Sequence, residues 1–206
     1  MTYTTDQEVF WAGKFGDDYL TRNQGEDMLA SNLNLFSRIL SRASSVRSIA
    51  ELGCNIGMNL RALSRIRKDY SLRGYEIHHG ASEEARASGS AEIINDTIIK
   101  PIVIDRQFDL TFTKGVLIHI NPEFLDCVYQ NLVNLSSRYV LISEYYSPTP
   151  VSVSYRGNED RLFKRDFAGE LIDRFGLRLI DYGFSYHRDP YFTNDDATWF
   201  LMEKQK

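Results

Sequence analysis

The sequence predicts an α/β fold built on a mainly parallel sheet. Apolar segments alternate with segments of helical period along the chain, which is the order expected when helices connect parallel strands. The segment 139–142 is apolar at every position, as a strand covered on both faces requires. Two closing strands, 177–186 and 197–203, have no helix between them, so we expect them to pair antiparallel at one edge of the sheet.

The strands before these two follow from short apolar runs bounded by polar or turn residues. We expect them at 46–52, 71–77, 92–95, 108–113 and 138–144. The first ends at Gly53, and a helix marked by apolar residues at positions 60, 63 and 66 begins near Gly57.

The remaining helices are predicted from apolar spacing and end signals. Residues 1–45 are polar and helical in pattern, and Asn121 with Pro122 is typical of a helix start. A third amphipathic helix is expected over 162–175, ended by Gly176. The segment 145–161 between strand and helix is expected to be irregular, because Pro148 and Pro150 interrupt strand ladders.

Composition limits the class of protein. The 206 residues are 43% hydrophobic and 25% charged with a net charge of −4, which predicts one soluble globular domain and excludes a disordered or disulfide-framework chain. Acidic and basic residues are interspersed, which disfavours a nucleic-acid partner. No signal pattern or membrane-length apolar run is present, and Cys54 and Cys127 are expected to be reduced. These features predict a cytoplasmic protein with no membrane partner.

The stretch 49–60 carries the strongest functional signal. A strand leads into Glu51-Leu-Gly53-Cys54-Asn55-Ile-Gly57 and then a helix, so the turn lies where ligands bind in doubly wound folds. It is not the dinucleotide fingerprint, because Asn55 holds the second glycine position and Met58 the third. A strand–helix turn without a ligand is the alternative.

This stretch resembles motif I of the class I S-adenosylmethionine-dependent methyltransferases, with Asn55 in place of the middle glycine. The resemblance implies a Rossmann-like fold with a seven-stranded, mainly parallel sheet, an antiparallel edge strand and helices on both faces. It also implies S-adenosylmethionine as cofactor and S-adenosylhomocysteine as product. The implied cofactor-binding residues in the motif are Glu51, Gly53, Cys54, Asn55 and Gly57.

Three further features fall where that family expects them. The second strand ends at Glu76, which the resemblance assigns to the ribose hydroxyls, and a carboxylate can accept both hydrogen bonds. Asp96 follows the third strand at the place of the acid that binds the adenine amino group, and 108–114, ending at Lys114, matches the motif IV region. A solvated strand end for Glu76 and a loop acid or helix cap for Asp96 are the alternatives.

The N-terminal segment 10–23 alternates aromatic and polar residues without a clean helical face. We expect a lid in which Tyr19 covers the cofactor and Arg22 binds its carboxylate, the alternative being a capping helix. The segments 15–23, 51–60 and 114–122 resemble the methyltransferases associated with pseudaminic acid biosynthesis, a bacterial branch linked to surface sugars. That resemblance implies a sugar-related acceptor, such as a nonulosonic acid or its nucleotide-activated precursor.

His119 follows the fourth strand and is the candidate general base, the alternative being a structural or cofactor-shaping role. Acceptor-binding residues are expected after the fifth strand, because tyrosine faces stack on sugar rings and arginine pairs with carboxylates or phosphates. The candidates are Tyr145, Tyr146, Tyr155 and Arg156, with Glu144, Arg161, His187 and Arg188 as further ones. His78 and His79 are adjacent loop residues, so no metal site is expected.

The resulting prediction is a single methyltransferase domain. It consists of an N-terminal helical lid (1–45), a cofactor-binding core (46–144) and an acceptor-side segment (145–206). The expected activity is methyl transfer to a small-molecule acceptor, namely to a hydroxyl of a bacterial surface-sugar intermediate, in a monomer or homodimer. The alternatives are a catalytically silent adenosine-binding regulatory module and a methyltransferase acting on another small molecule, RNA or protein.

Overall fold

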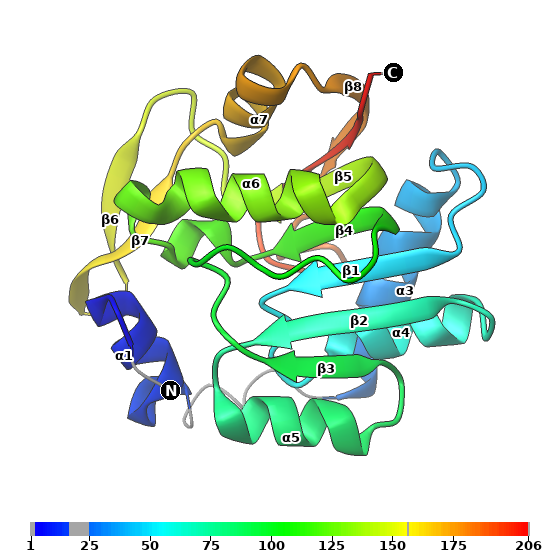
Figure 1. Ribbon diagram of the computed structural model, residues 1–206, viewed down its shortest axis with the longest axis horizontal. Coiled ribbons are helices and arrows are strands. Elements are labelled where there is room, and N and C mark those ends of the chain that lie inside the picture. The colour runs from blue at the N-terminus through cyan, green and yellow to red at the C-terminus, as the bar shows by residue number, and fades with distance from the viewer. Residues whose placement is uncertain (1–2, 17–24, 156, 206) are drawn as a thin grey trace.

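A seven-stranded sheet forms the centre of the molecule. The computed structural model describes residues 3–16, 25–155 and 157–205. The strands of the sheet are β1 (Ser48–Leu52), β2 (Ser71–Glu76), β3 (Glu92–Asn95), β4 (Phe108–Lys114), β5 (Ser136–Glu144), β8 (Arg178–Phe184) and β9 (Thr198–Glu203). Their spatial order is β3-β2-β1-β4-β5-β9-β8 (Figure 1). The first five pair in parallel and β9 runs antiparallel to both β5 and β8, which confirms the expected sheet.

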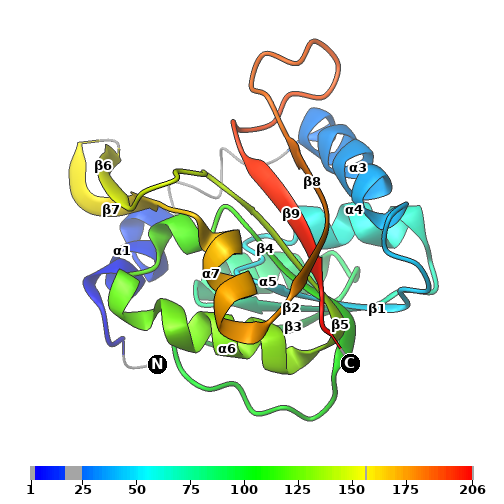
Figure 2. The same cartoon turned by 90° about the horizontal axis from the view of Figure 1, so that it is seen from above.

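Helices cover both faces of this sheet (Figure 2). One face packs against α3 (Glu26–Leu40), α4 (Met58–Ile66) and α5 (His79–Ala87), and the other against α6 (Leu125–Leu135) and α7 (Phe167–Phe175). Strand side chains alternate between the two cores: Leu110 and Phe112 of β4 join the first, while Val140 and Ile142 of β5 join the second. None of the described helices is both long enough and apolar enough to span a bilayer.

The strand order reverses direction at β1, which pairs with β2 on one side and β4 on the other. In open α/β sheets this switch point leaves a crevice at the carboxyl ends of the strands. The short helix α1 (Asp6–Ala12) lies at that end of the sheet (Figure 1). The fold therefore places α1 beside the crevice where a ligand is expected.

The segment expected to be irregular contains a β-hairpin instead. Its strands are β6 (Val151–Tyr155) and β7 (Asn158–Lys164), which pair antiparallel outside the main sheet. Pro148 and Pro150 both precede β6, so neither removes a donor from the ladder. Gly157, with φ of 81°, supplies a left-handed residue at the turn.

The helix expected over 162–175 begins later, at Phe167. Leu162 belongs to β7, and its apolar side chain is buried there rather than on a helix face. The Asp166 side chain caps the helix by accepting a 2.8 Å hydrogen bond from the Gly169 backbone N–H. Gly176, in a left-handed conformation, ends it as expected.

Helix α5 was not expected from apolar spacing. Its buried face consists of Ala81, Ser82 and Ala85, which are too small or too polar to produce a strong periodic signal. The helix is capped by His78, whose Nδ1 accepts a 3.0 Å hydrogen bond from the Ala81 N–H. Small side chains let α5 pack closely against the loop after β1, since Ala85 lies next to Gly57.

Candidate functional site

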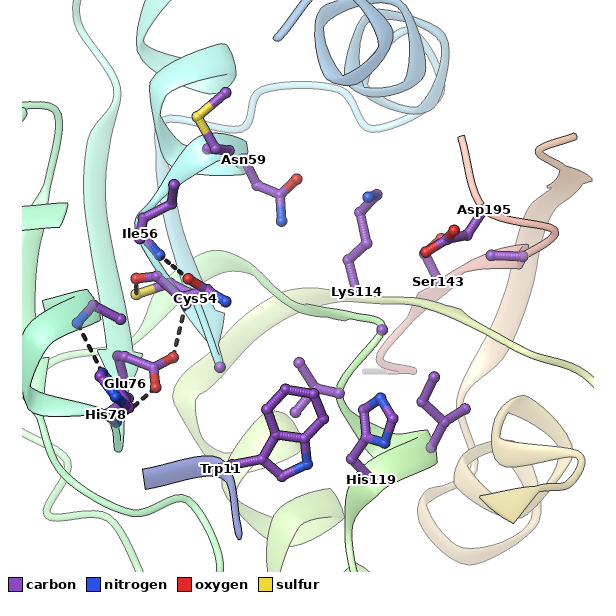
Figure 3. A pocket seen from close by; sticks show the side chains of 18 of the residues that line it. Trp11, Cys54, Ile56, Asn59, Glu76, His78, Lys114, His119, Ser143 and Asp195 are labelled. Atoms are coloured by element: carbon purple, nitrogen blue, oxygen red, sulfur yellow. Dashed lines mark hydrogen bonds between the residues drawn. The ribbon is translucent and has the colours of Figure 1, made fainter. Parts of the chain in front are cut away.

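A cavity of about 760 Å³ opens at the carboxyl ends of β1, β2, β4 and β5. Its wall includes residues from α1, α3, the loop after β1, the loop after β4, the β6 strand and the segment between β8 and β9. Figure 3 shows Glu76 and His78 at one end of this space and Ser143 and Asp195 at the other, with Trp11 and His119 between them. Ligand sites of this size and position are typical of doubly wound folds.

The glycine loop, defined here as residues 53–57, forms one wall of the cavity. Gly53 has φ of 81°, and a Cβ placed on it would lie 2.6 Å from Cγ2 of Val116. Gly57 is also left-handed, with φ of 77°, and stands directly before α4. Both positions therefore require glycine for conformational reasons, and Gly53 requires it for space as well.

Asn55 replaces the expected middle glycine without disturbing the loop. Its φ is 49°, in the left-handed region that asparagine tolerates better than most residues. Its side-chain Oδ1 accepts a 2.6 Å hydrogen bond from the Ile56 N–H, which stabilises this conformation. The departure from the glycine pattern is thus accommodated by local chemistry.

Glu76 at the end of β2 connects the glycine loop to α5. Oε2 accepts a 2.7 Å hydrogen bond from the Asn55 N–H, and Oε1 accepts one of 2.7 Å from the His78 N–H. The side chain lines the cavity although the residue is only 8% exposed, and burial raises the pKa of its carboxyl. Each carboxylate oxygen retains a free lone pair, so the group can accept further hydrogen bonds from a ligand.

Asp96, after β3, lines the same end of the cavity. It is exposed, and its Oδ1 accepts a 2.7 Å hydrogen bond from the Thr97 N–H. The Thr97 hydroxyl in turn donates to Oε1 of Glu8 on α1. Since Glu8 is buried and also caps its own helix, this contact fixes α1 against the edge of the cavity.

Glu51 lies beneath the cavity and is absent from its wall. The residue is 0% exposed, and Oε1 accepts a 2.6 Å hydrogen bond from Nδ2 of Asn59. Burial raises the pKa of the Glu51 carboxyl to about 8, so the group is mostly protonated at neutral pH. Glu51, which the sequence predicts to contact the cofactor directly, therefore lies behind Asn59, and Asn59 does line the cavity.

Lys114 at the end of β4 also lines the cavity. Burial lowers the pKa of its ammonium group, and the negative charge of Asp195 partly offsets that effect. No hydrogen bond or ion pair joins its Nζ to any residue in the part of the chain that the structure describes. Figure 3 shows this side chain extending into the cavity between Asn59 and Asp195.

His119 ends the short 3₁₀ helix η1 (Leu117–His119) after β4. Its Nδ1 lies 2.7 Å from the backbone oxygen of Arg161 in β7, which accepts a hydrogen bond from Nδ1–H and leaves Nε2 as the free acceptor. Burial lowers the pKa of His119 to about 4, so the ring is neutral at physiological pH.

Glu144 supports this loop from below. Both carboxylate oxygens lie 3.1 Å from the Val116 nitrogen, and Oε2 lies 3.4 Å from that of Ile118, so the carboxyl accepts from both backbone N–H groups. Burial raises its pKa to about 7. Glu144 does not line the cavity, so its contacts make it a support for the His119 loop rather than an acceptor-binding group.

Aromatic rings surround His119. The ring centroid of Trp11 on α1 lies 4.6 Å from that of His119, and the centroid of Tyr155 on β6 lies 5.0 Å from it. Tyr155 and Tyr145 both line the cavity, as expected for acceptor-binding residues. Tyr146 does not: it is exposed on the sheet side and its ring packs 6.1 Å from Phe200. Tyr19, Arg22 and Arg156 lie outside the described residues.

Several residues of the wall were not among the candidates predicted from the sequence. Helix α3 contributes Ser31 and Asn32, and the segment between β8 and β9 contributes Tyr191 and Asp195. No local motif marks these residues, because they belong to the site only through the packing of distant segments. His187 lines the cavity as a further candidate, and its Nδ1 lies 2.8 Å from Oδ2 of Asp196.

The expected motif residues that do line the cavity are Gly53, Cys54, Asn55, Glu76, Asp96, Lys114 and His119. Gly57 stands at the end of the loop, outside the wall itself. Among residues 3–16, 25–155 and 157–205, no three His, Cys, Asp or Glu side chains are grouped as metal ligands.

Solved structures of methyltransferases have a fold similar to that of this chain, whereas its sequence gives no match. No family model matches the chain, and no curated protein matches it in sequence. A magnesium protoporphyrin IX methyltransferase from Synechocystis, solved with bound SAM, has a TM-score of 0.71 at 12% identity, covering 100% of both chains. An S-adenosylmethionine-dependent methyltransferase from Clostridium acetobutylicum has a TM-score of 0.65 at 12% identity, covering 93% of this chain and 98% of that one.

A third similar structure is the O-methyltransferase of a trans-AT polyketide synthase from Brevibacillus brevis, in complex with S-adenosyl-L-homocysteine. Its TM-score is 0.65 at 13% identity, and the match covers 99% of this chain and 81% of that one. At such identities the likeness establishes the fold, and the chain has the Rossmann-like methyltransferase fold.

Proposed function

We propose that this protein is an S-adenosylmethionine-dependent methyltransferase that acts on a small-molecule acceptor. The observation that carries the proposal is Glu76, whose carboxylate lines the cavity at the end of β2 while it holds the glycine loop through Asn55. A pair of acceptor oxygens at this edge of the sheet supports the assignment of Glu76 to the hydroxyls of an adenosine ribose.

The residues of the cavity fit this cofactor. A space of about 760 Å³ accommodates a nucleoside-sized ligand together with an acceptor. The charged residues that line it within the described chain are Glu8, Asp27, Glu76, Asp96, Asp195 and Lys114. Five carboxyl groups against one ammonium group favour a cationic ligand such as a sulfonium over a polyphosphate.

The bound cofactor would supply an electrophilic methyl group on sulfur. The protein would hold the acceptor in line with that group and exclude water, and α1 with the β6–β7 hairpin covers the cavity on the side of His119. His119 Nε2 would accept the proton of an acceptor hydroxyl, because its Nδ1–H is already committed to Arg161. Burial keeps the ring neutral and therefore able to accept.

We further propose a hydroxyl of a bacterial surface-sugar intermediate, a nonulosonic acid or nucleotide sugar, as the acceptor. Support comes from the three sequence segments that resemble the pseudaminic acid-associated methyltransferases. The rings of Tyr145 and Tyr155 in the cavity provide faces on which a sugar can stack. Arg156, next to Tyr155 in the sequence, is proposed to pair with the acid group of such an acceptor.

Two measurements on the purified protein test the proposal. Mass spectrometry of the small molecules released from it is expected to detect S-adenosylmethionine or S-adenosylhomocysteine. Incubation with S-adenosylmethionine and candidate sugars or nucleotide sugars is expected to yield S-adenosylhomocysteine and a product heavier by one methyl group. Cofactor binding without transfer to any acceptor would favour a silent adenosine-binding module instead, and methylation only of acceptors unrelated to sugars would overturn the sugar assignment alone.

A further inference from the structure

The side chain of Lys114 is half-buried and lines the cavity, and its ammonium group has no hydrogen-bond or ion-pair partner among the described residues. Burying an unpaired charge costs free energy, and the lowered pKa of Lys114 expresses that cost. A ligand with a negatively charged group at this position would offset that free-energy cost. Lys114 is the only cation among the described residues of the cavity wall, which makes it the natural anchor for a carboxylate.

The register of β4 fixes where Lys114 emerges. Leu110 and Phe112 point to the face that packs against α3 and α4, and residue 114 has the same parity. The side chain therefore rises beside the first turn of α4, where Asn59 lies. In Figure 3 the side chains of Asn59 and Lys114 extend into the same part of the cavity, away from Glu76.

Asn59 is held in one orientation from below. Its Nδ2 donates a 2.6 Å hydrogen bond to Oε1 of Glu51, which is fully buried. This bond uses one of the two N–H donors of Nδ2 and orients the amide, and the carbonyl Oδ1 is left as an acceptor on a residue that lines the cavity. A further acceptor comes from α3, where the buried Oδ1 of Asn32 has no hydrogen-bond partner among the described residues.

We propose that Lys114 and Asn59 together bind the α-aminocarboxylate end of the cofactor, Lys114 through the carboxylate and Asn59 through the ammonium group. Glu51 is the positioning residue that orients Asn59 for this contact. The inference rests on the proposed function and adds to it the residues that recognise the amino-acid part of the ligand. It also gives the acid of the glycine-loop motif a different role, since Glu51 acts from beneath the wall rather than in it.

The alternative is that Lys114 binds an anionic group of the acceptor. The two possibilities predict different effects of Lys114 on the affinity of two ligands. S-adenosylhomocysteine carries the aminocarboxylate, whereas 5′-methylthioadenosine has the same adenosine and sulfur without it. If Lys114 serves the acceptor, removing its charge affects neither ligand.

The test is calorimetric titration of both ligands into the full-length protein and its variants. Lys114→Met is expected to weaken S-adenosylhomocysteine binding roughly ten- to one-hundred-fold, as loss of a charge-assisted hydrogen bond predicts, and to leave 5′-methylthioadenosine within about two-fold. Lys100→Met, which changes an exposed lysine outside the cavity wall, is the matched control and should alter neither affinity.

The positioning role of Glu51 is tested with the same two ligands. Glu51→Gln keeps a carbonyl oxygen for Asn59 and should retain S-adenosylhomocysteine binding. Glu51→Leu and Asn59→Leu should both weaken S-adenosylhomocysteine binding and leave 5′-methylthioadenosine binding unchanged. Equal weakening of both ligands, or unchanged S-adenosylhomocysteine affinity in Lys114→Met, would overturn the inference. Failure of the wild-type protein to bind either ligand would instead reject the proposed function.

Discussion

The backbone N–H of Asn55 donates a 2.7 Å hydrogen bond to Oε2 of Glu76, which joins the turn after β1 to the end of β2. The contact makes the conformation of the glycine loop and the position of the acid depend on each other. Because the second carboxylate oxygen is held by the His78 N–H, Glu76 is fixed at both oxygens before any ligand arrives. A group held in this way loses little conformational entropy on binding.

Removing the Glu76 carboxylate should therefore weaken cofactor binding directly. Glu76→Ala is expected to reduce the binding free energy of S-adenosylmethionine by roughly 1.5–3 kcal/mol, the usual range for hydrogen bonds to a charged group. Calorimetry measures this change, and Asp173→Ala, on an exposed position of α7, is the control. An unchanged affinity in Glu76→Ala would remove the ribose assignment.

The left-handed conformation of Asn55 predicts an unusual order of substitutions. Asn55→Gly should change stability only slightly, because glycine adopts a φ of 49° without strain and this offsets the lost hydrogen bond to Ile56. Asn55→Val should be less stable than Asn55→Gly by about 1–2 kcal/mol, since both variants lose the Ile56 hydrogen bond but only the β-branched residue is strained in the left-handed region. Urea unfolding of the two variants checks the order; a valine variant as stable as the glycine variant would contradict it.

If His119 accepts the acceptor proton, its replacement should affect turnover and not cofactor affinity. His119→Ala is expected to lower kcat roughly 100-fold or more with S-adenosylhomocysteine binding unchanged. Because burial places the pKa of His119 near 4, the group should cause no loss of wild-type activity as the pH falls from 7 to 5.5. A steep loss centred near pH 6.5, with protonation assigned to His119, would show that the ring is solvated as an ordinary histidine.

Glu51 should make the stability of the protein depend on pH. Its folded pKa of about 8 lies above the ordinary value of 4.5, so the folded state keeps a proton that the unfolded chain has lost. This contribution to stability is complete below pH 4.5 and declines as the pH rises toward 8, by about 1.4 kcal/mol per pH unit.

Glu51→Gln removes that ionisation and keeps the hydrogen bond to Asn59. The variant should therefore melt above the wild-type protein at pH 8 and close to it at pH 4.5. Thermal unfolding followed by circular dichroism at the two pH values gives the comparison. A difference in melting temperature that is the same at both would rule out a raised pKa at Glu51.

The sheet could be predicted from the sequence because its strands are apolar runs separated by clear turn residues. Helix α5 could not, since Ala81 and Ala85 bury too little apolar surface to show a period. The β6–β7 hairpin could not be predicted either, because Pro148 and Pro150 indicate irregular structure, although they lie just before the ladder rather than in it. In both cases tertiary packing decides the local structure.

The candidate site was predicted where one local motif supplies it. The glycine loop, Glu76 and Asp96 lie close together, because parallel strands end at the same edge of the sheet. Which side of the wall a residue occupies was not predictable: Glu51 lies beneath it and Tyr146 outside it. Asp195 enters the site from the far end of the chain, and only the order of β8 and β9 in the sheet brings it there.

The central claim is that the cavity binds S-adenosylmethionine, and titration of the wild-type protein with S-adenosylhomocysteine tests it most directly. We expect one ligand per chain, competition by adenosine and no competition by a dinucleotide such as NAD, because a wall with five carboxyl groups and one ammonium group disfavours a pyrophosphate. A folded protein that releases no heat with S-adenosylhomocysteine, or that binds NAD in its place, would contradict the account.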